Sequence, residues 1–267
     1  MLDKINEVLK NVREKTPLVQ AITNYVTIND CANILLCFGA SPAMCEAKEE
    51  VEEFVGLVSS LYINTGTLTK EQEEASLLAV KRAAELGKPV VLDPVALGAI
   101  SRKRTVIEKL LETGKITVIK GNAGEIKALA GFAGKMRGVD SVDDGEGLAE
   151  ACKSLAVKYG IVVVATGKTD IITDGSRTCL VDNGTEMLTL VTGAGCMAGA
   201  LVAGAVGAAD DAFVASVAAV TAMGLAGEMA AASMGKPLPG SFRPRLFDFI
   251  YGMSPEDVIK GGKVRCV

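Results

Sequence analysis

The chain of 267 residues contains no histidine and no tryptophan, and aromatic side chains make up only 4% of it. Without histidine it cannot build a Ser-His-Asp or Cys-His triad, a His-ligated zinc or haem site, or an imidazole general base. The few aromatics, the net charge of −4 and the absence of a dense Lys/Arg cluster argue against a nucleic-acid partner. Any chemistry must therefore use carboxylates, lysine, threonine, cysteine, backbone amides or a bound ion.

The composition is 49% hydrophobic, which is enough for a large core and excludes a disordered chain. No linker, repeat or change in composition divides the sequence, so we predict one domain over residues 1–267. The N-terminal segment MLDKINEVLKNVREK is charged and amphipathic, unlike a signal peptide, and we expect a cytoplasmic protein. The seven cysteines are odd in number and include no CxxC pair, which predicts reduced thiols rather than a disulfide framework.

Apolar runs of strand length alternate with amphipathic helical stretches along the chain. We predict strands at 17–23, 60–66, 89–94, 116–122 and 161–167, helices at 25–38, 48–58, 69–86 and 140–159, and a hairpin at 170–183. The alternation predicts an α/β fold with a parallel sheet covered by helices on both faces. The segment 197–234, rich in alanine and glycine, predicts a buried helix pair; Asp210 and Asp211 interrupt it and argue against a membrane span.

Polar residues and glycines recur where the predicted strands end. They are Asn24, Asn64–Gly66, Asp93, Lys120–Asn122, Thr166–Gly167 and Thr192–Cys196. Each one alone is explained by the needs of a turn. Because the carboxyl ends of parallel strands meet at one edge of a sheet, where ligands bind in open α/β folds, their recurrence predicts a ligand site.

The element that indicates a ligand site most specifically is TGAGC (192–196), which follows the apolar MLTLV and begins the Ala-rich helix. Its small residues allow a ligand to approach the backbone, and the free amides of the first helical turn, with the helix dipole, favour a phosphate or a developing negative charge. The alternative is close packing of a strand against a helix, which also requires small residues.

Two glycine motifs match known phosphate-binding patterns poorly. Gly193-x-Gly195-x-x-Ala198 fits the dinucleotide fingerprint, but Ala-rich helices follow it and no second strand is evident. Gly167-Lys168-Thr169 matches the end of a P-loop, but Val162 occupies the position of its first glycine and the next residues look extended.

A third motif begins at Asn122, where Asn-Ala-Gly-Glu opens a helix directly after a strand. Carboxylates together with substrate phosphates suit a hard cation, so Asp93 and Glu125, on neighbouring strand ends, are candidates to hold Mg²⁺ directly or through water. Asn122 and Glu125 also have the spacing of a helix capping box, and the two roles are compatible.

Together these motifs resemble the hydroxyethylthiazole kinase family of the ribokinase-like superfamily. Seven segments occur in the family's order and approximate spacing: ITNYVT (22–27), SPAMCEAKEEV (41–51), NTGTL (64–68), VVLDPVALGA (90–99), IKGNAGEI (119–126), ATG (165–167) and VTGAGC (191–196). The similarity runs from about residue 15 to residue 230. Seven ordered motifs make the resemblance specific even though each alone is loose.

The resemblance implies a ribokinase-like α/β sandwich and the ATP- and Mg²⁺-dependent phosphorylation of 4-methyl-5-(2-hydroxyethyl)thiazole in thiamine biosynthesis. It further implies a homotrimer with active sites between subunits. By motif, Met44 and Gly193 contact the thiazole alcohol with Asn24 near its hydroxyl, while Lys120 and Thr166, next to Gly167, contact ATP.

The sequence departs from the family pattern at two places. Lys120 stands before GNAGE where relatives usually carry arginine, which keeps the charge but loses the planar bidentate fork. DPVALGA carries an alanine where a glycine is usual, which leaves the shape of that loop open.

Position 196 is where superfamily relatives place an aspartate that accepts the alcohol's proton. Cys196 is a weaker substitute, and a thiol at a helix N-terminus is expected to have a lowered pKa. The amides of Gly193, Ala194 and Gly195 would stabilise charge on the transferred phosphoryl group. The alternative is that Cys196 only fills space beside the alcohol, because a loose phosphoryl transition state needs little base assistance.

Other functions remain open at this point. One is a related kinase acting on hydroxymethylpyrimidine, pyridoxal or a sugar. A nicotinamide-dependent oxidoreductase would instead use the GxGxxA stretch and bind NADH. A third alternative is a non-catalytic regulator that binds a nucleotide without turnover.

Overall fold

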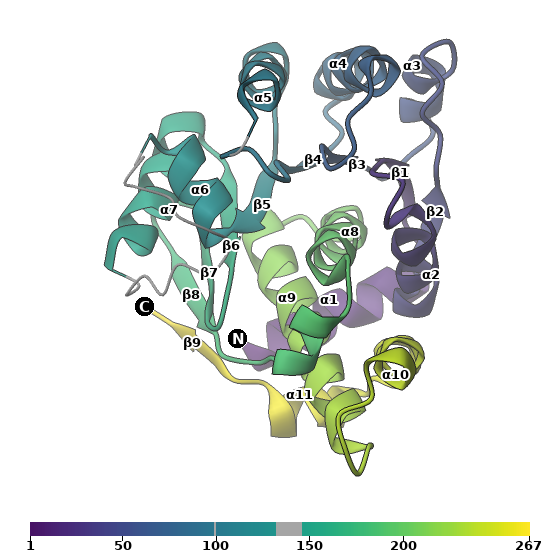
Figure 1. The fold of residues 1–267 in the computed structure, drawn as a ribbon, viewed down its shortest axis with the longest axis vertical. Coiled ribbons are helices and arrows are strands. Elements are labelled where there is room, and N and C mark those ends of the chain that lie inside the picture. The colour runs from purple at the N-terminus through teal and green to yellow at the C-terminus, as the bar shows by residue number, and fades with distance from the viewer. Residues whose placement is uncertain (99, 132–145) are drawn as a thin grey trace.

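The computed structural model describes residues 1–98, 100–131 and 146–267 (Figure 1). In this part of the chain nine strands form one sheet in the order β2-β1-β3-β4-β5-β6-β7-β8-β9. They are β1 (Leu18–Ile22), β2 (Ser41–Ala43), β3 (Ser60–Asn64), β4 (Val90–Asp93), β5 (Val118–Asn122), β6 (Val162–Thr166), β7 (Asp170–Thr173), β8 (Thr178–Val181) and β9 (Val264–Cys266). The pairs from β2 to β6 are parallel and those from β6 to β9 antiparallel, so the predicted mostly parallel sheet is confirmed.

Helices cover both faces of the sheet (Figure 1). One layer contains α1 (Leu2–Lys15), α2 (Ile28–Phe38), α8 (Ala194–Val206), α9 (Ala212–Ala232) and α10 (Pro239–Gly252). The other contains α3 (Val51–Val55), α4 (Lys70–Leu86), α5 (Ser101–Thr113), α6 (Ala123–Leu129) and α7 (Glu146–Tyr159). The short α11 (Pro255–Gly261) leads into β9. Each layer encloses its own apolar cluster against the sheet, because successive strand side chains point to opposite faces.

Most of the predicted elements lie close to their observed bounds. The helix predicted at 25–38 begins at Ile28 and ends before Gly39, whose φ of 100° is the left-handed conformation that stops a helix. The helix predicted at 48–58 shrinks to α3. Of the helix predicted at 140–159, residues 140–145 lie outside the described part and the rest forms α7.

Three elements differ from expectation. The three-residue strands β2 and β9 are too short to produce an alternating pattern, and the sequence did not reveal them. The apolar run MLTLV before the glycine motif, for which no element was predicted, lies in a 3-10 helix, η1 (Glu186–Leu190), and its C-cap Val191. Only Met187 of η1 is buried, and Leu190 is 57% exposed, so this run does not supply a core strand.

The Ala- and Gly-rich segment forms the predicted helix pair α8 and α9. By length and composition α9 is apolar enough to cross a membrane, but 83% of its most apolar window is buried inside the fold. In α8, a Cβ on Gly204 would lie 3.2 Å from a methyl group of Leu35, so glycine allows α2 to approach closely. The small residues therefore serve close packing within the protein core.

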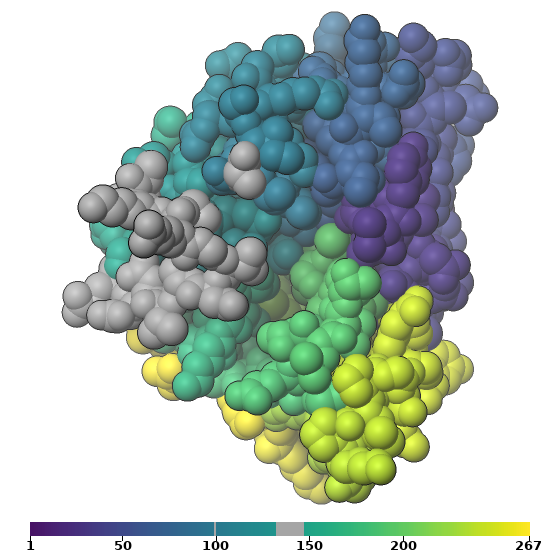
Figure 2. All heavy atoms as spheres, in the orientation of Figure 1, coloured from purple at the N-terminus to yellow at the C-terminus, as the bar shows by residue number. Residues whose placement is uncertain are grey.

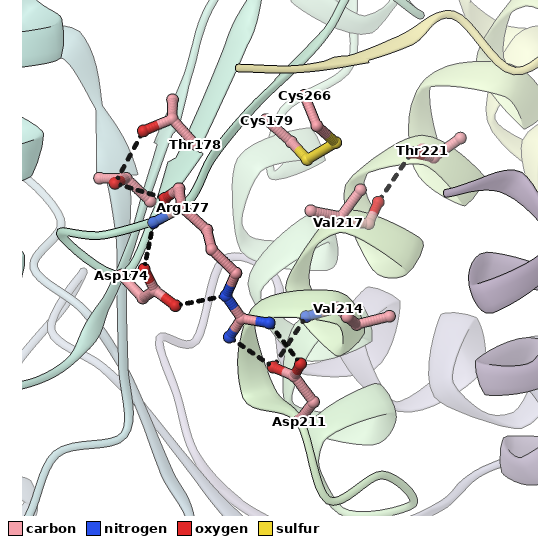
Figure 3. The surroundings of a disulfide bond; sticks show 10 residues. Asp174, Arg177, Thr178, Cys179, Asp211, Val214, Val217, Thr221 and Cys266 are labelled. Atoms are coloured by element: carbon pink, nitrogen blue, oxygen red, sulfur yellow. Dashed lines mark hydrogen bonds and ion pairs between the residues drawn. A yellow bond between two sulfur atoms is a disulfide. The ribbon is translucent and has the colours of Figure 1, made fainter.

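The prediction of wholly reduced cysteines is wrong for one pair. Cys179 of β8 and Cys266 of β9 are bonded to each other, while Cys31, Cys37, Cys45, Cys152 and Cys196 are free thiols (Figure 3). The two bonded residues lie directly opposite in the antiparallel pair. A separation of 87 residues, and a strand that the sequence did not reveal, concealed this proximity.

Candidate active site

The polar residues predicted at strand ends lie along one edge of the sheet. Asn24 follows β1, whereas Asn64, Asp93 and Thr166 are the last residues of β3, β4 and β6. Asn64 lies opposite Asp93 in the β3–β4 pair, and Asn122 lies opposite Thr166 in the β5–β6 pair. The sheet therefore aligns along one edge residues that are up to 142 positions apart in the sequence, from Asn24 to Thr166.

A buried ion pair joins two of these strands. Lys120 Nζ lies 3.2 Å from Asp93 Oδ2, and the two side chains are only 4% and 1% exposed. Burial raises the pKa of Asp93 to about 6, although the Lys120 charge counteracts this. Burial also disfavours the Lys120 ammonium, but the nearby carboxylates of Asp93 and Glu125 outweigh it and raise the pKa of Lys120. Lys120 therefore remains a fixed positive charge at the sheet edge.

Tyr62 of β3 links the ion pair to the glycine-rich helix. Its fully buried hydroxyl accepts a hydrogen bond from Asn64 Nδ2 (2.9 Å). It lies 3.1 Å from Asp93 Oδ2 and 2.9 Å from the Cys196 carbonyl oxygen, and its single proton can be donated to only one of them at a time. Tyr62 was not among the site residues predicted from the sequence. Its position two residues before Asn64, on the same face of a strand, was the available signal.

Asn24 holds the thiol of Cys196. Asn24 Oδ1 accepts the Thr27 backbone N–H at 3.2 Å, so its amide nitrogen donates, to Asn64 Oδ1 (2.9 Å) and to Cys196 Sγ (3.3 Å). Burial and the Asp93 charge raise the pKa of Cys196. The expectation of a lowered pKa at the helix N-terminus is therefore wrong, because burial and a neighbouring carboxylate disfavour the thiolate.

The N-terminus of α8 lies over this cluster. Its N-cap, Gly193, has φ 83° and provides no side-chain cap. The first-turn amides of Gly195 and Cys196 are available to an anion, whereas the Ala194 N–H makes a long hydrogen bond of 3.4 Å to the Val191 carbonyl. A Cβ on Gly195 would lie 3.2 Å from Lys120 Nζ, and one on Gly199 would lie 2.6 Å from the Tyr62 hydroxyl. The glycines thus provide close packing against the sheet as well as exposed amides, and the two interpretations of this motif are compatible.

Glu125 occupies a capping box and also reaches the neighbouring loop. Its Oε2 accepts the Asn122 N–H at 2.8 Å, and Asn122 Oδ1 accepts the Glu125 N–H at 2.9 Å. Its Oε1 accepts the Ala96 N–H at 2.9 Å. Ala96, the alanine in DPVALGA that stands where a glycine is usual, has φ 61°. This left-handed conformation favours glycine, so the alanine adopts it at some cost in backbone strain.

The residues that the resemblance assigns to ATP lie on the next strand. Thr166 Oγ1 donates to the Gly121 carbonyl at 3.3 Å, and the Gly167 N–H donates to Asp170 Oδ1 at 2.9 Å. Gly167, Lys168 and Thr169 form the turn between antiparallel strands β6 and β7. Because no helix follows that turn, it is not a P-loop. In the same way α9, not a strand, follows α8, so the dinucleotide-binding βαβ unit is absent from the described part of the chain.

Met44 lies just beyond β2, at the edge strand of the sheet. It is half-buried and packs against the same apolar cluster as Cys196.

Segments from distant parts of the chain meet on one face of the molecule. Figure 2 shows the green segment of η1 and α8 on this face, between purple N-terminal and teal central segments. The site is therefore assembled from both halves of the chain.

Solved structures share this architecture. A hydroxyethylthiazole kinase from Pyrococcus horikoshii superposes with a TM-score of 0.90 at 39% identity, covering 98% of each chain. A pyridoxal kinase from Staphylococcus aureus superposes with a TM-score of 0.56 at 16% identity, over 78% of this chain and 86% of its own, and this shows the fold alone. Fold and site together define a ribokinase-like α/β kinase.

Sequence comparison narrows the class to one family. The model of the hydroxyethylthiazole kinase family matches residues 9–256. The hydroxyethylthiazole kinase of Desulfitobacterium hafniense is 59% identical over 99% of both chains, and that of Clostridium kluyveri is 54% identical over 98% of this chain and 97% of its own. The chain belongs to the hydroxyethylthiazole kinase family.

Proposed function

We propose that the protein transfers the γ-phosphoryl group of ATP to the primary alcohol of 4-methyl-5-(2-hydroxyethyl)thiazole, in thiamine biosynthesis. Family membership over nearly the full length supports this activity. The observation in the structure that carries it is the buried Lys120 ammonium beneath the uncapped N-terminus of α8, beside the polar group formed by Asn24 and Cys196. A positive charge and backbone amides for the phosphates, next to polar side chains for the hydroxyl, are what phosphoryl transfer to an alcohol requires.

In this proposal the protein contributes mainly position and charge. Lys120 and Thr166, with Gly167, hold the phosphates, and the amides of Gly193, Ala194 and Gly195 stabilise charge on the transferred group. Asn24, Met44 and Gly193 surround the alcohol.

Mg²⁺ is part of the proposal, and the residues present suit it. Asp93 Oδ1 is buried and has no hydrogen-bond partner. The described residues contain no cluster of three or more His, Cys, Asp or Glu, but Mg²⁺ needs only one or two carboxylates when phosphates complete its shell. Asp93 and Glu125 would hold the ion, which when bound neutralises charge on the phosphate oxygens.

A homotrimer is also proposed, with sites completed between subunits. Three apolar side chains adjoin site residues and are more than half exposed: Tyr25 (54%), Val26 (61%) and Leu190 (57%). Exposed apolar side chains next to site residues suit a subunit interface. Light scattering should give the mass of three chains, and the mass of one chain would contradict the trimer.

We also propose a cytoplasmic location, where ATP is supplied. Recovery of the protein in the membrane fraction would contradict this location.

One assay tests the activity. The protein is incubated with Mg-ATP and the thiazole alcohol, and ADP release is measured against pyridoxal, hydroxymethylpyrimidine and sugar controls. Release that depends on the thiazole alcohol is the expected result. Release with a control substrate alone would favour a related kinase, whereas NADH binding without ADP release would favour an oxidoreductase.

The role of Cys196 is tested by substitution. Asn24 Nδ2 already donates toward position 196, so a carboxylate there gains a hydrogen bond, and Cys196→Asp should keep or raise kcat. Cys196→Ala should lower kcat about two- to tenfold, because a loose transition state needs little base assistance.

The pH dependence of kcat is a second test of Cys196. Its raised pKa makes the thiolate the minor form near neutral pH, so wild-type kcat should rise with pH above 7, and Cys196→Asp should abolish the rise. Cys37→Ala, on α2, is the control thiol. An unchanged rate in Cys196→Ala would exclude the base role.

The metal assignment is tested at Glu125. Glu125→Gln keeps one of the two acceptor oxygens, so the protein should fold while its apparent affinity for Mg²⁺ in the kinase assay falls about tenfold. Asp257→Asn is the matched control, because Asp257 forms a capping box with Ser254 on α11. If both variants give the wild-type Mg²⁺ titration, Glu125 is not part of the metal site.

A further inference from the structure

Asp170 is a buried carboxylate to which the mechanism above assigns no role. It is the first residue of β7, only 8% exposed, and it follows directly the turn that holds the proposed ATP-binding residues. That turn, Thr166–Thr169, is called the nucleotide loop below. A carboxylate kept out of water beside a site for phosphates needs an explanation, because burial of a charge is costly.

The contacts of Asp170 tie it to the loop backbone. Its Oδ1 accepts the Gly167 N–H at 2.9 Å and so fixes the residue next to Thr166. At the other end of the loop, Thr169 Oγ1 donates to Asp182 Oδ1 at 2.7 Å, and Arg265 of β9 lies 2.8 Å from Asp182 Oδ2. The loop is thus held at both ends by carboxylates on the β7–β8 hairpin and in the residues that follow it.

The two anchors differ in their surroundings. Asp182 is more accessible, and hydrogen bonds from Thr169 and then Arg265 lower its pKa. Burial raises the pKa of Asp170 to about 7, with Asp182 adding to the rise and the Gly167 N–H and Lys120 opposing it. Among its described contacts Asp170 has no ion-pair partner. Its side-chain contact is the hydrogen bond that it accepts from the Gly167 N–H of the loop.

We propose that Asp170 is a positioning residue that holds the nucleotide loop in the conformation that binds ATP. It acts through the Gly167 backbone and does not touch the substrate. With Gly167 fixed, Thr166 stays at the end of β6, next to Asn122 and within reach of the Gly121 carbonyl. The proposal rests on the assignment of Thr166 and Gly167 to ATP.

Two substitutions at Asp170 separate the hydrogen bond from the charge. Asp170→Asn retains a carbonyl oxygen that can accept the Gly167 N–H, and it should keep KM for ATP within about twofold of wild type. Asp170→Ala removes the acceptor and should raise KM for ATP about tenfold, while KM for the thiazole alcohol and kcat change little. The direct dissociation constant of ATP, measured by calorimetry, should follow the same order.

Asp174 provides the matched control. It follows β7 at the opposite end of the strand, and its Oδ1 accepts the N–H groups of Ser176 and Arg177 in a similar turn. Asp174→Ala should leave both KM values unchanged. Thermal unfolding of every variant shows that the compared proteins are folded at the assay temperature.

The outcomes distinguish this proposal from the proposed function. If wild type turns over the thiazole alcohol but Asp170→Ala binds ATP as wild type does, Asp170 is not a positioning residue and the function stands. Equal increases in both KM values would also overturn the proposal, because they indicate general damage to the site. If wild type shows no turnover, the kinase assignment fails, and the ATP dissociation constants still decide the role of Asp170.

Discussion

Lys120→Met should abolish most kinase activity and destabilise the fold. The substitution leaves Asp93 buried without its cation, and breaking a buried pair costs about 3–5 kcal/mol. It also removes the fixed positive charge beneath the N-terminus of α8, where the phosphates are proposed to bind. We expect kcat/KM to fall by about 10²–10³, measured at a temperature where urea unfolding shows the variant to be folded.

A double variant separates these two losses. Lys120→Met with Asp93→Asn removes both charges, so stability should recover by several kcal/mol relative to the single variant. Activity should not recover, because neither the cation nor the carboxylate is restored. Lys120→Arg keeps the charge and should retain much of the activity. A folded Lys120→Met with wild-type kcat/KM would show that this lysine does not serve the phosphates.

Gly193→Ala should have the second large effect, through sterics. Gly193 has φ 83°, which costs an alanine about 1–2 kcal/mol, and the new Cβ would lie 2.2 Å from Thr27 Cγ2. Thr27 is 2% exposed, so it has little room to move, and its N–H holds the Asn24 side chain. Displacing Thr27 therefore moves the amide that contacts Cys196. We expect kcat/KM to fall about 100-fold, since small displacements at a reacting centre cost that much.

The contact with Thr27 can be separated from the backbone strain. Gly87 has φ 64°, and a Cβ added there would have no other atom within 4 Å, so Gly87→Ala adds similar strain without overlap and should leave activity unchanged. Thr27→Ser removes the methyl group and keeps the hydroxyl that accepts from Cys31. Combined with Gly193→Ala, it should restore part of the lost activity. No restoration, with both proteins folded, would contradict the steric explanation.

Much of the fold follows from the periodicity of hydrophobic residues. The runs ending at Asn64, Asp93 and Asn122 are buried strands, and the alternation with helices implies parallel pairing. Elements of three residues carry no such pattern, and β2 and β9 remained hidden for that reason. The apolar run MLTLV was also left unassigned, because a short apolar run has the same composition in a strand and in a 3-10 helix.

The candidate site was predicted as a set of strand ends, and the structure brings most of these ends together. Asn24, Asn64, Asp93, Lys120 and Cys196 form one hydrogen-bonded cluster. Tyr62 was missed because a tyrosine in the middle of an apolar strand looks like an ordinary core residue in the sequence. Asp170 was missed because an aspartate after a turn is ordinary turn chemistry.

The sequence by itself determined the class of chemistry: without histidine, the polar strand ends and the glycine-rich helix start indicated an anion-binding site, and seven ordered motifs indicated the family. Those features are local and can be read from neighbouring residues. Tertiary structure alone decided the state of each group, because pKa values and contacts depend on burial and on distant partners. It raised the pKa of Cys196 where the local pattern predicted a lower one, paired Lys120 with Asp93, and joined Cys179 to Cys266.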